Sequence, residues 1–416
     1  MIMPFVNTKP IRLIELFAGI GSQAMALTRL GLHFEHYKMI EFDKSAVRSY
    51  NAVHHTTFAP SDITQIHGSD LGIVDTDEYT YLLTYSFPCQ DLSLAGKQKG
   101  MRKGDGTRSG LLWEVKRILQ ELDTLPQVLL MENVTQVHSK KNFHDFEKWL
   151  TFLESKGYSN YYQDLNAKDY GVAQNRNRCF MVSILGNHCF YFPKAKRLDK
   201  TVQDYLEKSV DDKYYISDEK IKMFVRESFI SEKDDVPRLI GGIGRKDFGS
   251  QYRQGNRVYD SHSIAMCLTA SPIGNTGGNS YLYAVYEQPS VLVKQATKQG
   301  YIECVAGGVA DLSYPTPNTR RGRVQENGKI SPTITASQIG IHRIESIFRI
   351  RKLTPKECWR LMGFDDEAFN KAASTSAETQ LYKQARNSIV VDVLMAIFEN
   401  LFIKARSIWL DELLSA

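Results

Sequence analysis

The stretch IRLIELFAGIGSQA, residues 11–24, joins an apolar run to a glycine-rich turn and the start of an amphipathic segment. It fits the pattern G-x-G-x-x-A at Gly19, Gly21 and Ala24, and Glu41 follows Gly21 by twenty residues, after the next apolar run. In a Rossmann-like unit such glycines let the backbone approach a ligand, and a carboxylate ending the second strand pairs with ribose hydroxyls. The motif predicts an adenosine-type cofactor and leaves nicotinamide and S-adenosylmethionine open. A glycine turn needed only for helix packing is the structural alternative.

Short apolar runs alternate with amphipathic segments from Ile11 to Leu185. Strands that alternate with helices predict a parallel, doubly wound α/β sheet, which binds ligands at the carboxyl ends of its strands. Strands are expected at Arg12–Phe17, Tyr37–Phe42, Tyr81–Phe87, Gln127–Met131, Tyr161–Leu165 and Cys179–Leu185, and helices at Ser22–Leu30, Lys44–Val53, Gly110–Leu122 and Phe143–Ser155. A hydroxyl in Thr107-Arg108-Ser109 would cap the third of these helices.

The composition is that of an ordinary globular protein. The 416 residues suffice for two or three domains, with 42% hydrophobic and 24% charged residues. No apolar run is long enough for a membrane helix, and residues 1–10 lack the core of a signal peptide. The six cysteines form no CxxC pair and no zinc spacing, so we expect reduced thiols, no metal and a cytoplasmic protein.

A second candidate site lies at the carboxyl ends of the later strands. Cys89 follows an apolar run rich in aromatic residues, and Glu132 ends the next such run. Alternation along a strand points Arg176 and Arg178 the same way. A thiol, a carboxyl group and two guanidiniums at one sheet edge suit attack on a pyrimidine ring, because thiolates are strong nucleophiles. Each residue alone has a plainer structural alternative: a buried hydrophobe, a helix cap or a solvated turn.

The amino-acid composition of the chain changes after Gly186. Residues 187–344 are rich in Gly, Ser, Asn, Tyr and short β-like runs, whereas Thr354, Pro355 and Glu357 form the start signature of a helix. We therefore expect an α/β domain built from residues 1–186 and 345–416, with a small β-rich domain, residues 187–344, inserted between them.

The inserted region contains a weak internal repeat. Residues 257–270 align with residues 323–336, with shared Arg, Val, Ile, Thr and Ala. In this alignment Cys267 stands opposite Thr333. The repeat fits either a duplicated β-hairpin unit or chance in a β-rich segment.

Six motifs follow one another along the chain. They are Phe17-Ala18-Gly19-Ile20-Gly21, Phe87-Pro88-Cys89-Gln90, Glu132-Asn133-Val134, Gln174-x-Arg176-x-Arg178, the stretch from Arg351 to Phe364, and Asn387-Ser388. In type and order they resemble the motifs of DNA cytosine-5 methyltransferases, and they cover both ends of the chain. The stretch Leu82–Glu114 is most similar to bacterial members of the CpG-methylating kind, so a role in restriction-modification is expected.

The resemblance implies an S-adenosylmethionine-dependent enzyme that flips a cytosine out of double-stranded DNA, because the ring edge is unreachable inside the stack. Cys89 would attack C6 and form a covalent intermediate, and Glu132 would hydrogen-bond or protonate N3. Arg178, supported by Arg176, would hold the O2 side. The implied cofactor contacts are Phe17, Ala18, Gly19, Ile20, Gly21, Glu41, Asp62, Ile63, Pro88, Asn387 and Ser388. Asp62 would reach the adenine amino group, although a helix cap is equally open.

DNA is the expected partner, and a monomer the expected state. The net charge of +5 is small, but basic residues gather in residues 97–108 and from Arg320 to Lys352. Phosphate contacts supply most non-specific affinity for nucleic acid, and Arg and Gln read guanine and adenine edges. The inserted domain is then the target-recognition domain. The expected DNA contacts are Gln90, Ser93, Lys97, Lys99, Arg102, Lys103, Arg108, Arg245, Gln251, Arg253 and Arg257, with Gln254 as a further candidate base reader.

The chain departs from the family pattern at Arg386, where glycine usually precedes Asn-Ser. If a positive φ angle is needed there, strain of about 1 kcal/mol or more is expected.

Three other functions compete with this one. A nicotinamide oxidoreductase leaves Cys89, Glu132 and the arginines unused. An RNA cytosine methyltransferase shares the chemistry, but its relatives carry little inserted material. A DNA-binding module without activity would have no use for Cys89 and Glu132.

Overall fold

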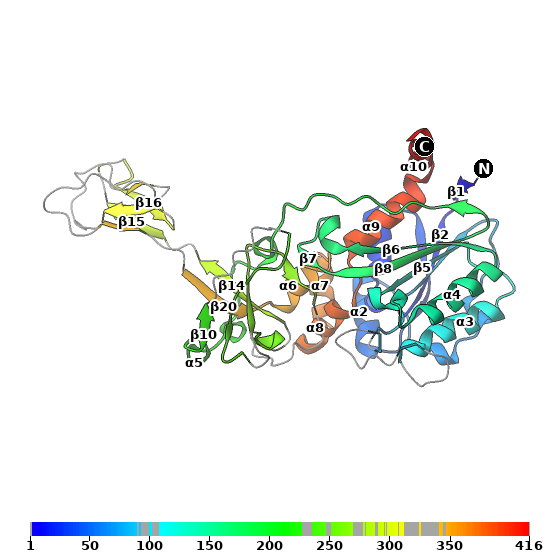
Figure 1. Cartoon of the computed structure of the whole chain (residues 1–416), viewed down its shortest axis with the longest axis horizontal. Coiled ribbons are helices and arrows are strands. Elements are labelled where there is room, and N and C mark those ends of the chain that lie inside the picture. Colours follow the sequence, from blue (N-terminus) through cyan, green and yellow to red (C-terminus); the bar gives the residue numbers. More distant parts are fainter. Residues whose placement is uncertain are drawn as a thin grey trace.

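The structure is a computed structural model of the 416-residue chain (Figure 1). It describes residues 2–89, 91–92, 100–101, 108–226, 235–246, 251–268, 278, 280–287, 290–294, 296, 298–306, 308–311, 324–325, 341–343 and 347–415.

The larger lobe is built on a six-stranded sheet in the order β3-β2-β4-β5-β8-β6. Its first four strands are parallel, while β8 runs antiparallel to both of its neighbours. The expectation of a parallel sheet is therefore wrong at β8. The six strands are β2 (Ile11–Leu16), β3 (Phe34–Ile40), β4 (Thr80–Tyr85), β5 (Val128–Asn133), β6 (Tyr158–Asn166) and β8 (Asn177–Leu185).

Helices cover both faces of this sheet (Figure 1). Side chains of α1 and α9 share one apolar core with one face, and side chains of α3 and α4 share another with the opposite face. Because the strands are buried on both sides, they read as nearly continuous apolar runs. The covering helices are α1 (Ser22–Arg29), α2 (Lys44–His54), α3 (Leu112–Glu121), α4 (Phe143–Ser155) and α9 (Val391–Phe398), followed by α10 (Ala405–Ser415). Two further helices, α7 (Asp366–Ala373) and α8 (Glu378–Asn387), pack against α2. No helix among the described residues is long and apolar enough to cross a membrane.

The smaller lobe holds a five-stranded sheet in the order β10-β11-β12-β14-β20. Its last strand, β20, pairs antiparallel with β14 along six residue pairs. This strand therefore belongs to the smaller lobe, although it lies beyond residue 344, the expected end of the inserted domain. The sheet therefore runs to Lys352, and α6 begins directly after it at Pro355. The elements of this lobe are α5 (Asp218–Ile221), β10 (Phe224–Arg226), β11 (Leu239–Ile243), β12 (Arg257–Asp260), β14 (Leu282–Glu287) and β20 (Ile347–Lys352).

A further group of strands is inserted at the tip of the β14–β20 ladder, which closes at the pair Glu287 and Ile347. The strands β15 (Ser290–Lys294) and β16 (Tyr301–Val305) pair with each other, and β17 (Val309–Asp311) pairs with β18 (Val324–Gln325) and β19 (Ile341–Arg343). We call residues 288–346 the outer insert. Figure 1 shows its strands beyond the smaller lobe, on the side away from the six-stranded sheet.

Two short strand pairs join segments that are far apart in the chain. Near the N-terminus, β1 (Met3–Pro4) pairs with β9 (His188–Cys189). Between the lobes, β13 (Ala265–Met266) pairs with β7 (Gln174–Asn175), directly before the expected arginines.

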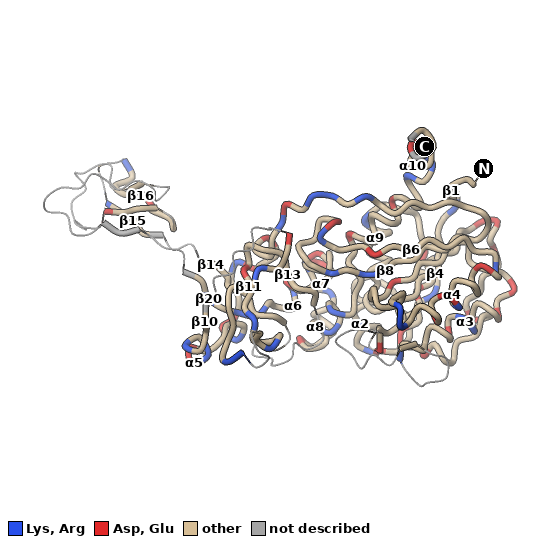
Figure 2. The backbone as a smooth tube through the Cα atoms, viewed as in Figure 1, with Lys and Arg blue, Asp and Glu red and all other residues tan. Residues whose placement is uncertain are grey.

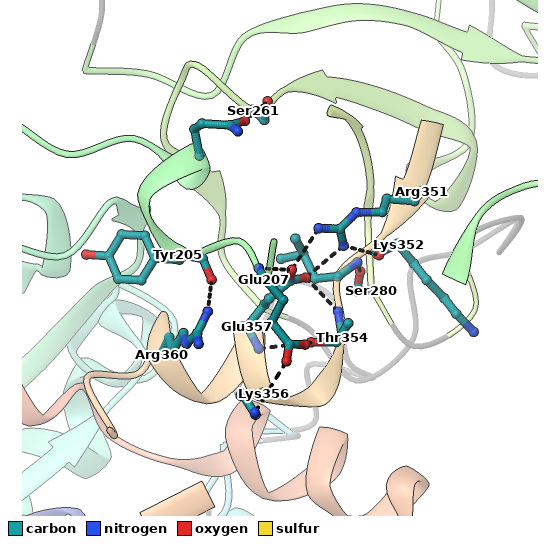
Figure 3. Close-up of polar contacts among 12 residues, drawn as sticks. Tyr205, Glu207, Ser261, Ser280, Arg351, Lys352, Thr354, Lys356, Glu357 and Arg360 are labelled. Atoms are coloured by element: carbon teal, nitrogen blue, oxygen red, sulfur yellow. Dashed lines mark hydrogen bonds and ion pairs between the residues drawn. The ribbon is translucent and has the colours of Figure 1, made fainter. Parts of the chain in front are cut away.

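A buried ion pair joins the smaller lobe to α6 (Pro355–Arg360). Arg351 and Glu357 are 1% and 0% exposed, and two hydrogen bonds of 2.8 and 2.7 Å connect their side chains. The Glu357 carboxylate also accepts the backbone N–H groups of Glu207 and Thr354, both at 2.8 Å. Figure 3 shows this arrangement, in which Thr354 caps α6 as the sequence predicts.

We predict that Arg351→Met destabilises the protein by about 3–5 kcal/mol, because it leaves the Glu357 carboxylate buried without its counter-charge. Chemical denaturation followed by circular dichroism measures this. The control is Arg349→Met on the same strand, whose side chain is 45% exposed and pairs with Asp212 at 3.6 Å. An exposed pair contributes about 1 kcal/mol or less. Equal losses in the two variants would contradict the importance of the buried pair.

Candidate active site

The glycine turn after β2 forms one half of the site. Gly19 has φ +58°, and a Cβ there would meet no atom within 4 Å, so the turn borders open space. Gly21 has φ +79°, and a Cβ there would collide with the His54 imidazole. Glycine is thus required at Gly21 both by its backbone angle and by close packing.

Glu41 is bonded to this turn. Its carboxylate accepts the Gly19 N–H at 3.1 Å and the Asp43 N–H at 2.8 Å. Burial raises the pKa of Glu41, while these backbone hydrogen bonds oppose the rise. The predicted pair of glycine turn and carboxylate therefore meets at one sheet edge, and free lone pairs on the carboxylate can still accept hydroxyl groups.

Two neighbours of Glu41 complete this half. Phe42 is 74% exposed, which is rare for a large apolar side chain. In the sequence it stands at the end of an expected strand, and no role in the site was predicted for it. Asp62 is brought near because the Ser61 N–H bonds the Glu41 carbonyl at 2.9 Å. One Asp62 oxygen accepts the Thr64 N–H at 2.9 Å, so this residue caps a short helical turn, as the sequence left open.

The thiol of Cys89 lies just past the end of β4, in a segment held from two sides. The Asn133 side chain donates to the Phe87 carbonyl at 2.9 Å, and the Ser109 hydroxyl donates to the Pro88 carbonyl at 2.7 Å. The hydroxyl cap expected before α3 is therefore wrong for Ser109, which holds the Cys89 segment instead. Only the fold brings these residues together, so sequence spacing gave no sign of this role.

Glu132, at the end of β5, is 8% exposed and faces Arg178 of β8, with 3.3 Å between its Oε1 and the arginine Nε. Burial raises the pKa of Glu132, and the Arg178 and Arg176 guanidiniums oppose the rise. Burial also raises the pKa of the Cys89 thiol, the Glu132 charge raises it further, and the two arginines again oppose. The four predicted catalytic residues therefore interact in one buried site.

Arg176 connects this site to the C-terminal segment. Its Nη2 donates to the carbonyls of Arg386 at 3.2 Å and Ser388 at 2.9 Å. The next residue, Ile389, donates its N–H to the Ser22 hydroxyl at 3.2 Å, beside the glycine turn. The Asn387-Ser388 segment thus lies between the arginines and the glycine turn.

The strain expected at Arg386 is absent. Arg386 lies in the last turn of α8, where the backbone is right-handed helical rather than left-handed. A side chain at this position therefore costs no backbone strain, and the usual glycine is not needed for a positive φ angle here.

The predicted DNA contacts divide into two groups. Arg245, Gln251, Arg253 and Gln254 are exposed in the smaller lobe, while the half-buried Arg257 bonds the Gln251 side chain at 3.1 Å. Figure 2 shows further Lys and Arg residues around β10 and α5 of this lobe. Arg108 is exposed and its N–H bonds Asp91 at 2.8 Å. Gln90, Ser93, Lys97, Lys99, Arg102 and Lys103 lie outside the described residues.

One group of metal-binding residue types comes together behind the site. His138, Asp164 and Cys179 bring ligand atoms within 4.8 Å of one another, and His138 Nε2 lies 2.8 Å from Asp164. Burial raises the pKa of the Cys179 thiol well above its usual range, which disfavours the thiolate that a metal needs. The cluster is therefore explained as a His–Asp hydrogen bond beside a protonated thiol.

The fold and the arrangement at its carboxyl edge define a Rossmann-like methyltransferase of the S-adenosylmethionine-dependent class. The family model for C-5 cytosine-specific DNA methylases matches residues 11–403. The chain belongs to this family, and its cofactor is S-adenosylmethionine. The reading as a DNA cytosine-5 methyltransferase is thus confirmed, and the RNA alternative is disfavoured.

Three curated relatives illustrate the similarity. Type II methyltransferase M2.ScrFI of Lactococcus lactis is 28% identical, covering 94% of this chain and 99% of its own length. Orphan methyltransferase M.SssI of Spiroplasma monobiae is 33% identical over 64% of this chain and 81% of its own. Type II methyltransferase M.HhaI of Haemophilus parahaemolyticus is 29% identical, covering 94% of each chain.

Solved structures share the fold. The Entamoeba histolytica methyltransferase EhMeth has a TM-score of 0.62 at 16% identity, covering 96% of this chain and 99% of its own. The Schizosaccharomyces pombe Dnmt2 methyltransferase has a TM-score of 0.57 at 19% identity, covering 94% and 97%.

We predict that Glu132→Gln lowers the pH at which Cys89 becomes a thiolate, because the Glu132 charge helps to raise the pKa of this thiol. Arg178→Gln has the opposite effect, because the guanidinium lowers that pKa. The pH dependence of iodoacetamide labelling at Cys89, followed by peptide mass spectrometry, measures both shifts. Identical labelling profiles in wild type and Glu132→Gln would show that the two groups are not coupled.

Proposed function

We propose that the protein methylates C5 of a cytosine flipped out of double-stranded DNA, with Cys89 as the nucleophile. The observation that carries the proposal is the convergence of Cys89, Glu132, Arg176 and Arg178 in one buried site beside the glycine turn. Relatives named as Type II methyltransferases further suggest a modification role in the cytoplasm.

The proposed reaction assigns one task to each side chain. The Cys89 thiolate adds to C6 and makes C5 a nucleophile. Glu132, whose pKa is raised by burial, hydrogen-bonds or protonates N3 as negative charge develops there. Arg178 holds the O2 side, and Arg176 supports it. Once C5 has taken the methyl group, loss of the C5 proton to a base lets the Cys89 sulfur leave C6.

The cofactor edge fits the group that the family uses. Bound S-adenosylmethionine supplies the methyl group. Open space beside Gly19, the Glu41 carboxylate and the exposed Phe42 ring offer a backbone approach, hydroxyl acceptors and an apolar face for an adenosine. We assign Phe17, Ala18, Ile20, Gly21, Asp62, Ile63, Pro88, Asn387 and Ser388 to the same pocket.

We propose residues 187–344, which include the outer insert up to residue 344 and every strand of the smaller lobe's sheet except β20, as the target-recognition domain. Support comes from the exposed Arg245, Gln251 and Arg253, and from β13, which brings this lobe against the arginine strand. We propose that the protein acts on double-stranded DNA as a monomer and that its reaction needs no metal.

We predict that Cys89→Ala abolishes methylation while S-adenosylmethionine still binds, and that Glu132→Gln lowers the rate by about 10²–10⁴-fold, the usual contribution of a general acid. Single-base mapping of 5-methylcytosine on a plasmid, with calorimetry of cofactor binding, measures both. The matched control is Cys189→Ala, a half-buried thiol beside β1. Methylation by Cys89→Ala at the wild-type rate would overturn the proposed nucleophile.

We predict that the outer insert adds DNA affinity without contributing to catalysis. The pair Glu287 and Ile347 lies opposite in the β14–β20 ladder, so a two-residue Asn-Gly turn can replace residues 288–346. The shortened chain should keep its cofactor affinity and kcat, but show a higher KM for DNA and a weaker salt dependence. An unchanged KM and salt dependence would exclude the outer insert from the DNA interface.

A further inference from the structure

Cys267 of the smaller lobe lies directly at the arginine pair of the larger lobe. It follows β13, whose residues Ala265 and Met266 pair in register with Gln174 and Asn175. The Leu268 N–H also bonds the Gln174 side chain at 3.2 Å. Backbone and side-chain bonds on both sides of Cys267 therefore fix its position against the strand that carries Arg176 and Arg178.

The sulfur of Cys267 accepts a hydrogen bond from each arginine. Arg176 Nη1 and Arg178 Nη2 both lie 3.6 Å from the Sγ atom. Burial lowers the pKa of Arg176 and the neighbouring charge of Arg178 lowers it further, which reflects repulsion between the two cations. A single acceptor between the two guanidiniums offsets this repulsion.

The Cys267 sulfur completes the set of contacts that orient Arg178. The Nε of Arg178 faces Glu132 at 3.3 Å, its Nη1 donates to the Asn177 carbonyl at 2.8 Å, and its Nη2 donates to Cys267. The planar guanidinium is thereby held in one orientation from three sides, which suits a group that must meet the edge of a flat base.

We propose that Cys267 is a positioning residue of the methylation site, whose sulfur holds Arg176 and Arg178 together and orients Arg178 toward the cytosine. The inference rests on the proposed function, in which Arg178 holds the O2 side. It assigns to a residue of the smaller lobe a direct part in ordering the catalytic residues.

The thiolate form of Cys267 serves this role best, because an anion between two cations binds both more strongly than a neutral thiol. Burial opposes its ionisation, but Arg176 and Arg178 outweigh burial and lower the pKa of this thiol. Among the residues that the structure describes, Cys89 and Glu132 are the other titratable groups whose charges act on Arg178.

The test compares Cys267→Ala and Cys267→Thr with wild type. Threonine is the residue opposite Cys267 in the repeat, at position 333, and its hydroxyl is an acceptor that does not ionise. We expect kcat to fall about 10–100-fold in Cys267→Ala, the scale of a small misplacement in an active site, and less in Cys267→Thr, with cofactor affinity unchanged. Cys189→Thr is the matched control thiol and should behave as wild type.

The pH profile separates positioning from mere packing. The ratio of kcat between wild type and Cys267→Thr should rise as Cys267 ionises, at a pH below that of an ordinary thiol, and then level off. The ionisation of Cys89 is measured separately in each protein by its iodoacetamide labelling, so its contribution to the ratio is known. The difference in ultraviolet thiolate absorbance between the two proteins, titrated over the same range, should show the same transition.

A ratio that does not change with pH, or wild-type kcat in Cys267→Ala, would overturn the positioning role. In that case an inactive Cys89→Ala beside an active wild type would leave the proposed reaction intact. If wild type itself forms no 5-methylcytosine, the proposed function fails instead. If Cys267→Ala does not fold, as judged by thermal melting, Cys267→Thr alone decides the question.

Discussion

The buried ion pair between Arg351 and Glu357 is the interaction that holds the last strand of the smaller lobe, β20, against helix α6. It fixes the end of β20 against the first turn of α6, and the same carboxylate holds the backbone at Glu207 (Figure 3). Removing two charges from water costs several kcal/mol, which only complete pairing offsets. A small shift of β20 against α6 would break that pairing, so the pair favours a single arrangement of this strand and this helix.

This constraint extends to the catalytic arginines along a short path. Leu353, between β20 and α6, accepts the Tyr382 hydroxyl of α8 at 2.6 Å, and α8 ends where the Ser388 carbonyl binds Arg176. The helix that continues from the smaller lobe therefore supports a helix whose C-terminal end orients a catalytic residue. The segment that follows the insertion thus supplies contacts that orient Arg176.

Much of this architecture could be predicted from the sequence. Gly19, Gly21 and Glu41 mark the cofactor edge because local backbone chemistry demands those residue types, and the alternation of apolar runs gave each strand of the six-stranded sheet. The direction of β8 could not be predicted, since residues buried on both faces read alike in parallel and antiparallel strands. The strain predicted at Arg386 was wrong because the glycine that is usual in the family at this position does not reveal the backbone angle that this chain adopts.

The contacts that order the site were beyond sequence reasoning, because they join residues far apart in the chain. Ser109 looked like a helix cap, and Cys267 looked like one member of a weak repeat. In the folded protein both lie against catalytic residues, one at the Cys89 segment and one at the arginine pair. Two cations, a carboxyl group and two thiols share one largely buried space, so each charge is set by the others. The site is ordered by a balance of charge contributed by both lobes, and that balance exists only once the lobes are joined.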